Sequence, residues 1–156
     1  MADLKARLRA DLAAAIKGRE TTRMAALRMA LTAVTTEEVA GDVARELSDA
    51  EVERVLTREV KKRKEAAEAF AGAGRTESAQ AERDESAVLS EYLPKQLGDD
   101  ELSSLVAAAV AEVTEQLGAP PAQRQMGQVM KAANAKIAGR AEGGRVAAAV
   151  KSLLQS

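Results

Sequence analysis

The chain has 156 residues, of which 46% are apolar and 30% charged, and its net charge is −1. It contains no cysteine and no histidine, which excludes disulfides, thiolate metal sites and the commonest general base of enzymes. With one Phe, one Tyr and no Trp, an aromatic core is excluded as well, and the alanine-rich composition favours helices packed on helices.

Apolar residues three or four positions apart predict helices from the start of the chain, and no stretch has the alternation of a strand. A first helix is expected to end at Gly18, because glycine readily adopts the left-handed conformation that closes helices. A second helix has its apolar face between Met24 and Val34 and ends before Gly41.

The third and fourth helices have clearer boundaries. Ser48 and Glu51 have the spacing of a capping box, in which each side chain accepts a hydrogen bond from the other residue's backbone N–H. The third helix is therefore expected to begin there and to extend to Gly72 or slightly beyond. A polar fourth helix is predicted over residues 75–92, and Pro94 stops it.

Three further helices follow the proline. The first has an apolar stripe from Leu102 to Leu117 and stops at Gly118–Pro121. The second is lined by apolar residues from Met126 to Ile137 and ends at Gly139, and the third is lined by those from Val146 to Leu154.

The predicted fold is all-α. Residues 1–94 are expected to form an antiparallel bundle of about four helices, and residues 95–156 a small three-helix tail domain. Each half is small for a protein core, so we expect them to touch. The pattern leaves open whether they form one rigid body.

No pattern of residues supports catalysis or cofactor binding. The sequences Gly-x-x-x-x-Gly-Lys-[Ser/Thr], Gly-x-Ser-x-Gly and His-Glu-x-x-His are all absent. The cluster Asp99-Asp100-Glu101 is interpreted as charge that complements a helix N-terminus, with Mg²⁺ binding as the alternative. We therefore expect no catalytic residue, no metal and no cofactor.

Neither a membrane segment nor a signal peptide is predicted. No run of 18 apolar residues occurs, and the chain begins with a charged helical pattern. The expectation is a soluble cytoplasmic protein without a membrane partner.

Basic residues gather in two regions, of which the first lies on the predicted third helix. It comprises Arg54, Arg58, Lys61, Lys62, Arg63 and Lys64. Around a helix these side chains point about 100° apart, and Glu59, Glu65 and Glu68 dilute their charge. We interpret this region as an ordinary solvated helix face, with a nucleic-acid patch as the alternative.

The second region is the segment from Ala119 onward, which carries +5 on a chain of net charge −1. Such a local positive surface attracts polyanions such as RNA. Free backbone N–H groups near Glu142 also favour phosphate. The candidate RNA-binding residues are Lys131, Lys136, Arg140, Arg145 and Lys151, which would position phosphates, with Gly127 and Gly139, which would allow close backbone approach. The alternative is a core pair of helices fringed with basic residues.

Several short blocks follow one another along the chain. They are Tyr92-Leu93-Pro94-Lys95-Gln96-Leu97, Asp99-Asp100-Glu101-Leu102, Met126-Gly127-Gln128-Val129-Met130-Lys131 and Lys136-Ile137-Ala138-Gly139-Arg140-Ala141. In order and spacing they resemble the GatB/YqeY family, and with the N-terminal segment the resemblance covers essentially the whole chain. The resemblance implies an α-helical domain followed by a small helical tail that contacts tRNA.

The same domain forms the C-terminal part of the B subunit of the glutamine-dependent aspartyl/glutamyl-tRNA amidotransferase. The family label, carbon–nitrogen ligase with glutamine as amido-N donor, describes that larger enzyme. No ATP site, ammonia channel or glutaminase nucleophile is recognisable in this chain. One departure is Glu142, where the family has Asp. Glu is a poor N-cap, so the last helix is expected to start one or two residues later.

The leading hypothesis is a non-catalytic accessory module that binds RNA, with tRNA as the ligand that the resemblance implies and no DNA expected. Because the C-terminal segment has no aromatic residue, contact is expected with the RNA backbone and shape. The second hypothesis is a protein-interaction module that docks to translation or amidotransferase proteins. The third is an enzyme that assists amide transfer on misacylated tRNA.

Overall fold

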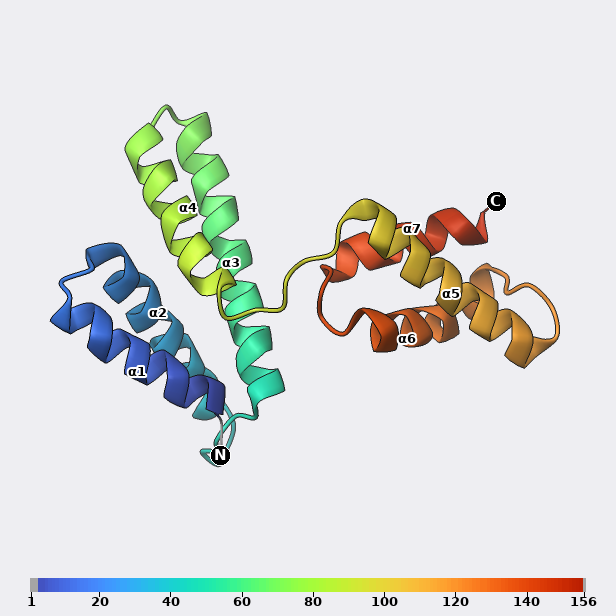
Figure 1. Cartoon of the computed structure of the whole chain (residues 1–156), viewed down its shortest axis with the longest axis horizontal. Coiled ribbons are helices and arrows are strands. Elements are labelled where there is room, and N and C mark those ends of the chain that lie inside the picture. Colours follow the sequence, from blue (N-terminus) through green and yellow to red (C-terminus); the bar gives the residue numbers. More distant parts are fainter. Residues whose placement is uncertain (1–2, 156) are drawn as a thin grey trace. The chain divides into compact units, whose positions relative to one another are not determined.

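The structure, a computed structural model, describes residues 3–155. In this part of the chain every regular element is helical, which confirms the predicted all-α fold (Figure 1). The tertiary contacts divide the chain into one unit that ends at Leu93 and another that begins at Pro94. None of the described helices is both long and apolar enough to cross a membrane.

The first unit consists of two helical hairpins. They are α1 (Asp3–Lys17) with α2 (Thr21–Glu38), and α3 (Asp49–Gly72) with α4 (Thr76–Ser90). The two hairpins meet because α2 packs on both α3 and α4, and α1 contacts α3. Leu8, Leu27, Leu56 and Leu89 bring one fully buried leucine from each helix into a common core.

The start of α3 is fixed by the predicted capping box. Ser48 Oγ accepts a hydrogen bond from the N–H of Glu51, and Glu51 accepts one from the N–H of Ser48. The chain then meets α1, because Asp49 accepts a hydrogen bond from the N–H of Leu4 at 3.1 Å. The local cap thus becomes part of the contact between the two hairpins.

The second unit is a three-helix arrangement. Its elements are α5 (Asp99–Leu117), the 3₁₀ turn η1 (Gln123–Gln125), α6 (Met126–Ile137) and α7 (Gly143–Leu154). Val106, Val129 and Val146, one from each α-helix, are buried in its core. The helix α7 follows Glu142 directly, so the predicted later start is wrong. Glu142 nonetheless makes no side-chain capping hydrogen bond, as expected from its extra methylene.

The turn between α6 and α7 is left-handed and tied to the start of the unit. Ala138 and Gly139 have φ angles of 51° and 78°. The carbonyl of Arg140 accepts a hydrogen bond from the N–H of Leu97 at 2.7 Å. Residues 96–98 and 139–140 therefore lie side by side, although they are more than 40 positions apart in the sequence.

Candidate nucleic-acid interface

Lys131 occupies the outer face of α6. The inner face of this helix buries Val129, Ala133 and Ile137. Lys131 lies two positions from both Val129 and Ala133, which at 100° per residue places it roughly 160° from each. Its side chain is exposed and has no carboxylate partner within the described residues. Lys131 is therefore available to a ligand without breaking any contact.

Lys151 and Arg124 are available in the same sense. Lys151 lies in the last turn of α7, one position after the buried Val150, and Arg124 lies in η1. Both side chains are exposed, and neither has a carboxylate partner among residues 3–155. A cation in the last turn of a helix is also favoured by the negative end of its macrodipole. Both cations can therefore reach solvent.

Lys136 is paired with a carboxylate. Its Nζ lies 3.1 Å from Glu112 Oε2 on α5, with the two side chains 33% and 44% exposed. Such exposed pairs contribute about 0–1 kcal/mol to stability, because water screens them. Glu112 is therefore a partner that a phosphate group can replace at small cost.

Arg145 joins the start of α7 to the start of α5. Its Nη2 donates to the carbonyl oxygen of Leu97 at 3.0 Å and to Asp99 Oδ1 at 2.9 Å. The Asp99 side chain is 96% exposed, so the ionic part of this contact is again screened. The bond to the carbonyl gives Arg145 a structural role in addition to its charge.

Arg140 caps the C-terminus of α6. Its Nε donates to the carbonyl of Ile137 and its Nη2 to that of Lys136, both at 2.9 Å. These carbonyls belong to the last turn of the helix, where no intrahelical donor is available. The guanidinium has no carboxylate partner, so its positive charge remains at the turn, but two of its nitrogens are occupied.

The two glycines of the candidate site differ in their backbone. Gly139 needs its φ of +78°, which other residues rarely adopt. Gly127 is an exposed residue of the first turn of α6, and an added Cβ would meet no atom within 4 Å. The surface of the backbone at Gly127 is therefore open.

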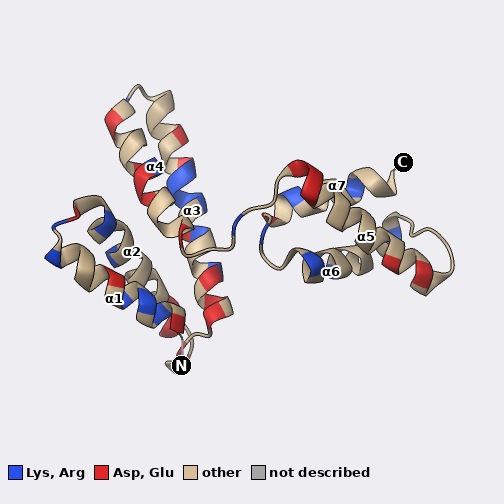
Figure 2. Ribbon diagram, in the orientation of Figure 1, with Lys and Arg blue, Asp and Glu red and all other residues tan. Residues whose placement is uncertain are grey.

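Acidic residues of α5 balance much of the charge of the second unit. From residue 94 onward the sequence has seven basic and six acidic residues, a net charge of +1. Figure 2 shows the acidic residues at the two ends of α5 and the basic residues on α6, α7 and their connecting turn. The segment of +5 is thus not a single uncompensated patch. Among the described residues of this unit, the basic side chains without a carboxylate partner are Lys95, Arg124, Lys131, Arg140 and Lys151.

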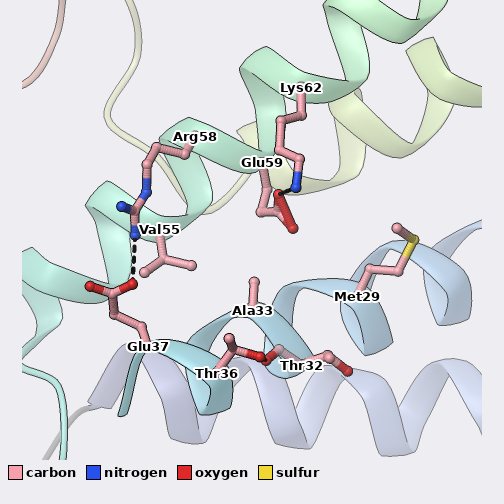
Figure 3. Close-up of a pocket in the computed structure, with 9 residues that line it drawn as sticks. All are labelled: Met29, Thr32, Ala33, Thr36, Glu37, Val55, Arg58, Glu59 and Lys62. Atoms are coloured by element: carbon pink, nitrogen blue, oxygen red, sulfur yellow. Dashed lines mark hydrogen bonds and ion pairs between the residues drawn. The ribbon is translucent and has the colours of Figure 1, made fainter. Parts of the chain in front are cut away.

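A groove in the first unit was not predicted from the sequence. It lies between α2 and α3, has a volume of about 460 Å³, and its floor includes Met29, Ala33 and Val55 (Figure 3). Two ion pairs border it: Arg58 with Glu37 at 3.2 Å, and Lys62 with Glu59 at 3.5 Å. The signal in the sequence was the presence of three small residues on one side of α2, Thr32, Ala33 and Thr36, which leave space beside that helix.

A buried charged cluster adjoins this groove, because Arg63 contacts Met29 and Glu59, which line it. Arg63 is 3% exposed and donates from Nη1 to the carbonyl of Glu59 at 3.0 Å. Its Nε lies 3.5 Å from Glu85 Oε2, an ion-pair distance without a hydrogen bond. Burial raises the pKa of the Glu85 carboxyl, an effect that the nearby Arg63 opposes. The cluster fixes α3 to α4.

The family of the chain follows from a comparison with known protein families. The model of the family described as Yqey-like protein matches residues 5–154. The chain belongs to the YqeY-like family. The match runs from within α1 to the end of α7 and so includes both units. A search of curated proteins finds no match.

The seven candidate residues of this YqeY-like protein all lie on α6, on α7 or in the turn between them. The structure separates the five basic residues among them into three groups. Lys131 and Lys151 are unpaired, Lys136 and Arg145 have carboxylate partners, and Arg140 is held by carbonyls. The sequence contains no signal for this division, because the partners Glu112 and Asp99 are 24 and 46 positions away.

Proposed function

We propose that this YqeY-like chain is a non-catalytic RNA-binding module whose second unit contacts the phosphate backbone. The observation that carries the proposal is the pair of exposed lysines on α6 and α7, Lys131 and Lys151, which have no carboxylate partner among residues 3–155. Positive side chains without counterions are the groups that gain most from contact with phosphate. The ligand proposed is tRNA, on the basis of the family resemblance alone.

The candidate residues are expected to contribute unequally. Lys131 and Lys151 should supply most of the electrostatic attraction. Lys136 and Arg145 have to exchange a carboxylate for a phosphate, which is a small penalty because both pairs are exposed. Arg140 is expected to attract phosphate by its charge, but its guanidinium cannot move freely, because two of its nitrogens donate hydrogen bonds to backbone carbonyls.

The form of RNA follows from the missing aromatic residues. Phe70 and Tyr92 are the only aromatic side chains of the chain, and both precede the second unit. Bases of single strands need aromatic platforms for stacking, whereas duplex RNA is read by its backbone and shape. The folded, largely double-helical body of a tRNA suits such a surface.

The proposal is tested by binding of tRNA to the full chain at several salt concentrations. We expect tight binding at about 50 mM salt that weakens steeply as the salt concentration rises, because released counterions drive the association. The variant Lys131→Gln/Lys151→Gln should bind more weakly. A matched control is Arg9→Gln/Lys17→Gln, which removes the same charge from exposed positions of α1. Equal binding by the two variants would count against the proposed surface.

A second candidate function, docking to a protein of the translation or amidotransferase machinery, is favoured by one observation. Val39 and Val43, which lie between α2 and α3, are 60% and 78% exposed. Two exposed valines in one loop are suited to contact with an apolar partner surface. Co-purification of a protein that survives nuclease treatment and is lost in Val39→Ser/Val43→Ser would favour this function over RNA binding.

A further inference from the structure

The exposed residues of α3 between positions 54 and 64 are all basic except Thr57. Between residues 54 and 64, the exposed residues are Arg54, Thr57, Arg58, Lys61, Lys62 and Lys64. Figure 2 shows this concentration of basic residues in the middle of α3. At 1.5 Å per residue the cations extend over about 15 Å of helix. We call this surface the α3 basic face.

Glu59, which reduces the net positive charge of residues 54–64 in the sequence, is buried in the fold. Glu59 is only 8% exposed, and its carboxylate lies 3.7 Å from Arg63 Nη1, a guanidinium that is itself buried. Burial thus removes one acidic and one basic side chain, Glu59 and Arg63, from the exposed surface of α3. The next acids, Glu65 and Glu68, follow only after the last cation of the face. The exposed positions between 54 and 64 therefore include no acid, and the Glu59 carboxylate meets the face only where it lies 3.5 Å from Lys62.

The cations of the α3 basic face are only partly neutralised. Arg58 pairs with Glu37 at 3.2 Å, with the two side chains 62% and 42% exposed. Lys62 lies 3.5 Å from Glu59 and its side chain is 74% exposed (Figure 3). Arg54 and Lys64 have no carboxylate partner among residues 3–155. Exposed pairs of this kind are weak, so Arg54, Arg58, Lys62 and Lys64 remain available to an anion.

We propose that the α3 basic face is a second contact for the phosphate backbone of the RNA that the second unit binds. This inference rests on the proposed function. The face presents no exposed apolar side chain between residues 54 and 64. Protein interfaces depend on buried aromatic or apolar anchors, whereas phosphate backbones require only positive charge and hydrogen-bond donors. The composition of the face therefore favours a phosphate backbone over an acidic protein.

The test measures tRNA binding by the full chain as a function of salt. The variant Arg54→Gln/Lys61→Gln/Lys64→Gln should bind on the order of tenfold or more weakly at about 0.1 M salt, and its salt slope should fall by about two to three. The control Arg9→Gln/Lys17→Gln/Arg83→Gln removes the same charge elsewhere in the first unit. It should bind within about threefold of the wild type. A third variant, Arg54→Lys/Lys61→Arg/Lys64→Arg, keeps the charge and should bind like the wild type.

The possible outcomes separate this inference from the proposed function. No tRNA binding by the wild type at about 50 mM salt would overturn both. Wild-type binding that is weakened by Lys131→Gln/Lys151→Gln, but equal in the α3 variant and its control, would overturn only the α3 contact. Loss of binding in the charge-keeping variant would also overturn it. If the α3 variant loses binding to poly-glutamate but keeps binding to tRNA, the face recognises acidic protein instead.

Discussion

The hydroxyl of Tyr92 donates a hydrogen bond of 2.5 Å to Asp11 Oδ2, which is 81 positions earlier in the chain. Arg23 Nη2 donates to the same hydroxyl at 3.2 Å, and the Arg7 guanidinium lies 4.7 Å from the centre of the ring. Tyr92 is the second residue after α4, whereas its partners belong to α1 and α2. Arg23 also pairs with Glu91 at 2.8 Å, so two side chains that follow α4, Glu91 and Tyr92, hold the end of the first unit to the opposite hairpin.

Replacing Tyr92 with Phe should destabilise the first unit. The ring and its contact with Arg7 remain, but Asp11 and Arg23 lose their shared partner. Loss of hydrogen bonds to charged groups in this setting corresponds to about 1–2 kcal/mol of unfolding free energy. Urea unfolding followed by circular dichroism measures the change. An unchanged unfolding free energy would mean that water satisfies Asp11 and Arg23 equally well.

The same contacts make the stability of the first unit vary with pH in the alkaline range. Burial, followed by the hydrogen bond to Asp11, raises the pKa of Tyr92 from 10.0 to about 12. Because the folded-state pKa is the higher one, this contribution to stability is complete below pH 10 and declines as the pH rises towards 12. Tyr92 is the only tyrosine, so absorbance of tyrosinate reports on it alone. A titration midpoint near 10 in the folded protein would contradict the contact.

Lys5, near the start of α1, and Glu38, at the end of α2, form a largely buried ion pair. Lys5 Nζ lies 2.6 Å from Glu38 Oε1, both side chains are 11% exposed, and Glu38 also accepts from the N–H of Leu47. The hydrogen bond from Lys5 lowers the pKa of Glu38. Stability from this group is therefore present above pH 4.5 and lost as the pH falls through the lowered value.

The variant Glu38→Gln tests this pair. We expect a loss of about 1–3 kcal/mol at pH 7, because Lys5 keeps its charge in a buried position without a carboxylate. The matched control is Glu37→Gln, which removes an exposed partner of Arg58 and should change stability by less than about 0.5 kcal/mol. The stability difference between Glu38→Gln and the wild type should shrink in acid. A constant difference from pH 7 to pH 3 would contradict the assignment.

Gly127→Ala separates a role in RNA binding from a role in folding. Position 127 has helical backbone and open space around a new Cβ, so alanine should stabilise the second unit by about 0.5–1 kcal/mol. If RNA contacts the backbone at position 127, the added methyl group should nevertheless lower the affinity of the protein for RNA. The comparison is Gly139→Ala, which should destabilise the unit by about 1 kcal/mol because of its φ of +78°. Tighter RNA binding by Gly127→Ala would argue against close approach.

Residue spacing predicted the local features of this fold, apart from the start of α7. The cap of Ser48 and Glu51 spans three residues and was predicted correctly, as were the seven helices and their order. The candidate cations were also identified, but not their partners. Lys136 meets Glu112, and Tyr92 meets Asp11, only because distant helices pack together. The burial of Glu59, which leaves residues 54–64 of α3 without an exposed acid, depends on packing in the same way.

The structure also changes which variants are informative. Substitution of Arg140 by Ala removes charge, but it also removes two hydrogen bonds that cap α6. A loss of RNA binding in that variant would not distinguish charge from folding. The side chains of Lys131 and Lys151 make no hydrogen bond within the described residues, so their substitution removes charge without breaking a structural bond.

The most direct test is therefore the salt dependence of tRNA binding by the wild type and by Lys131→Gln/Lys151→Gln. If both lysines contact phosphates, the slope of log K against log salt concentration should be less steep by about two in the variant. Thermal unfolding of the two proteins should differ only slightly, because neither lysine has a carboxylate partner to lose and Lys151 gives up only its weak attraction to the C-terminal end of α7. Equal slopes with measurable binding, or no binding by the wild type at about 50 mM salt, would contradict the proposed surface.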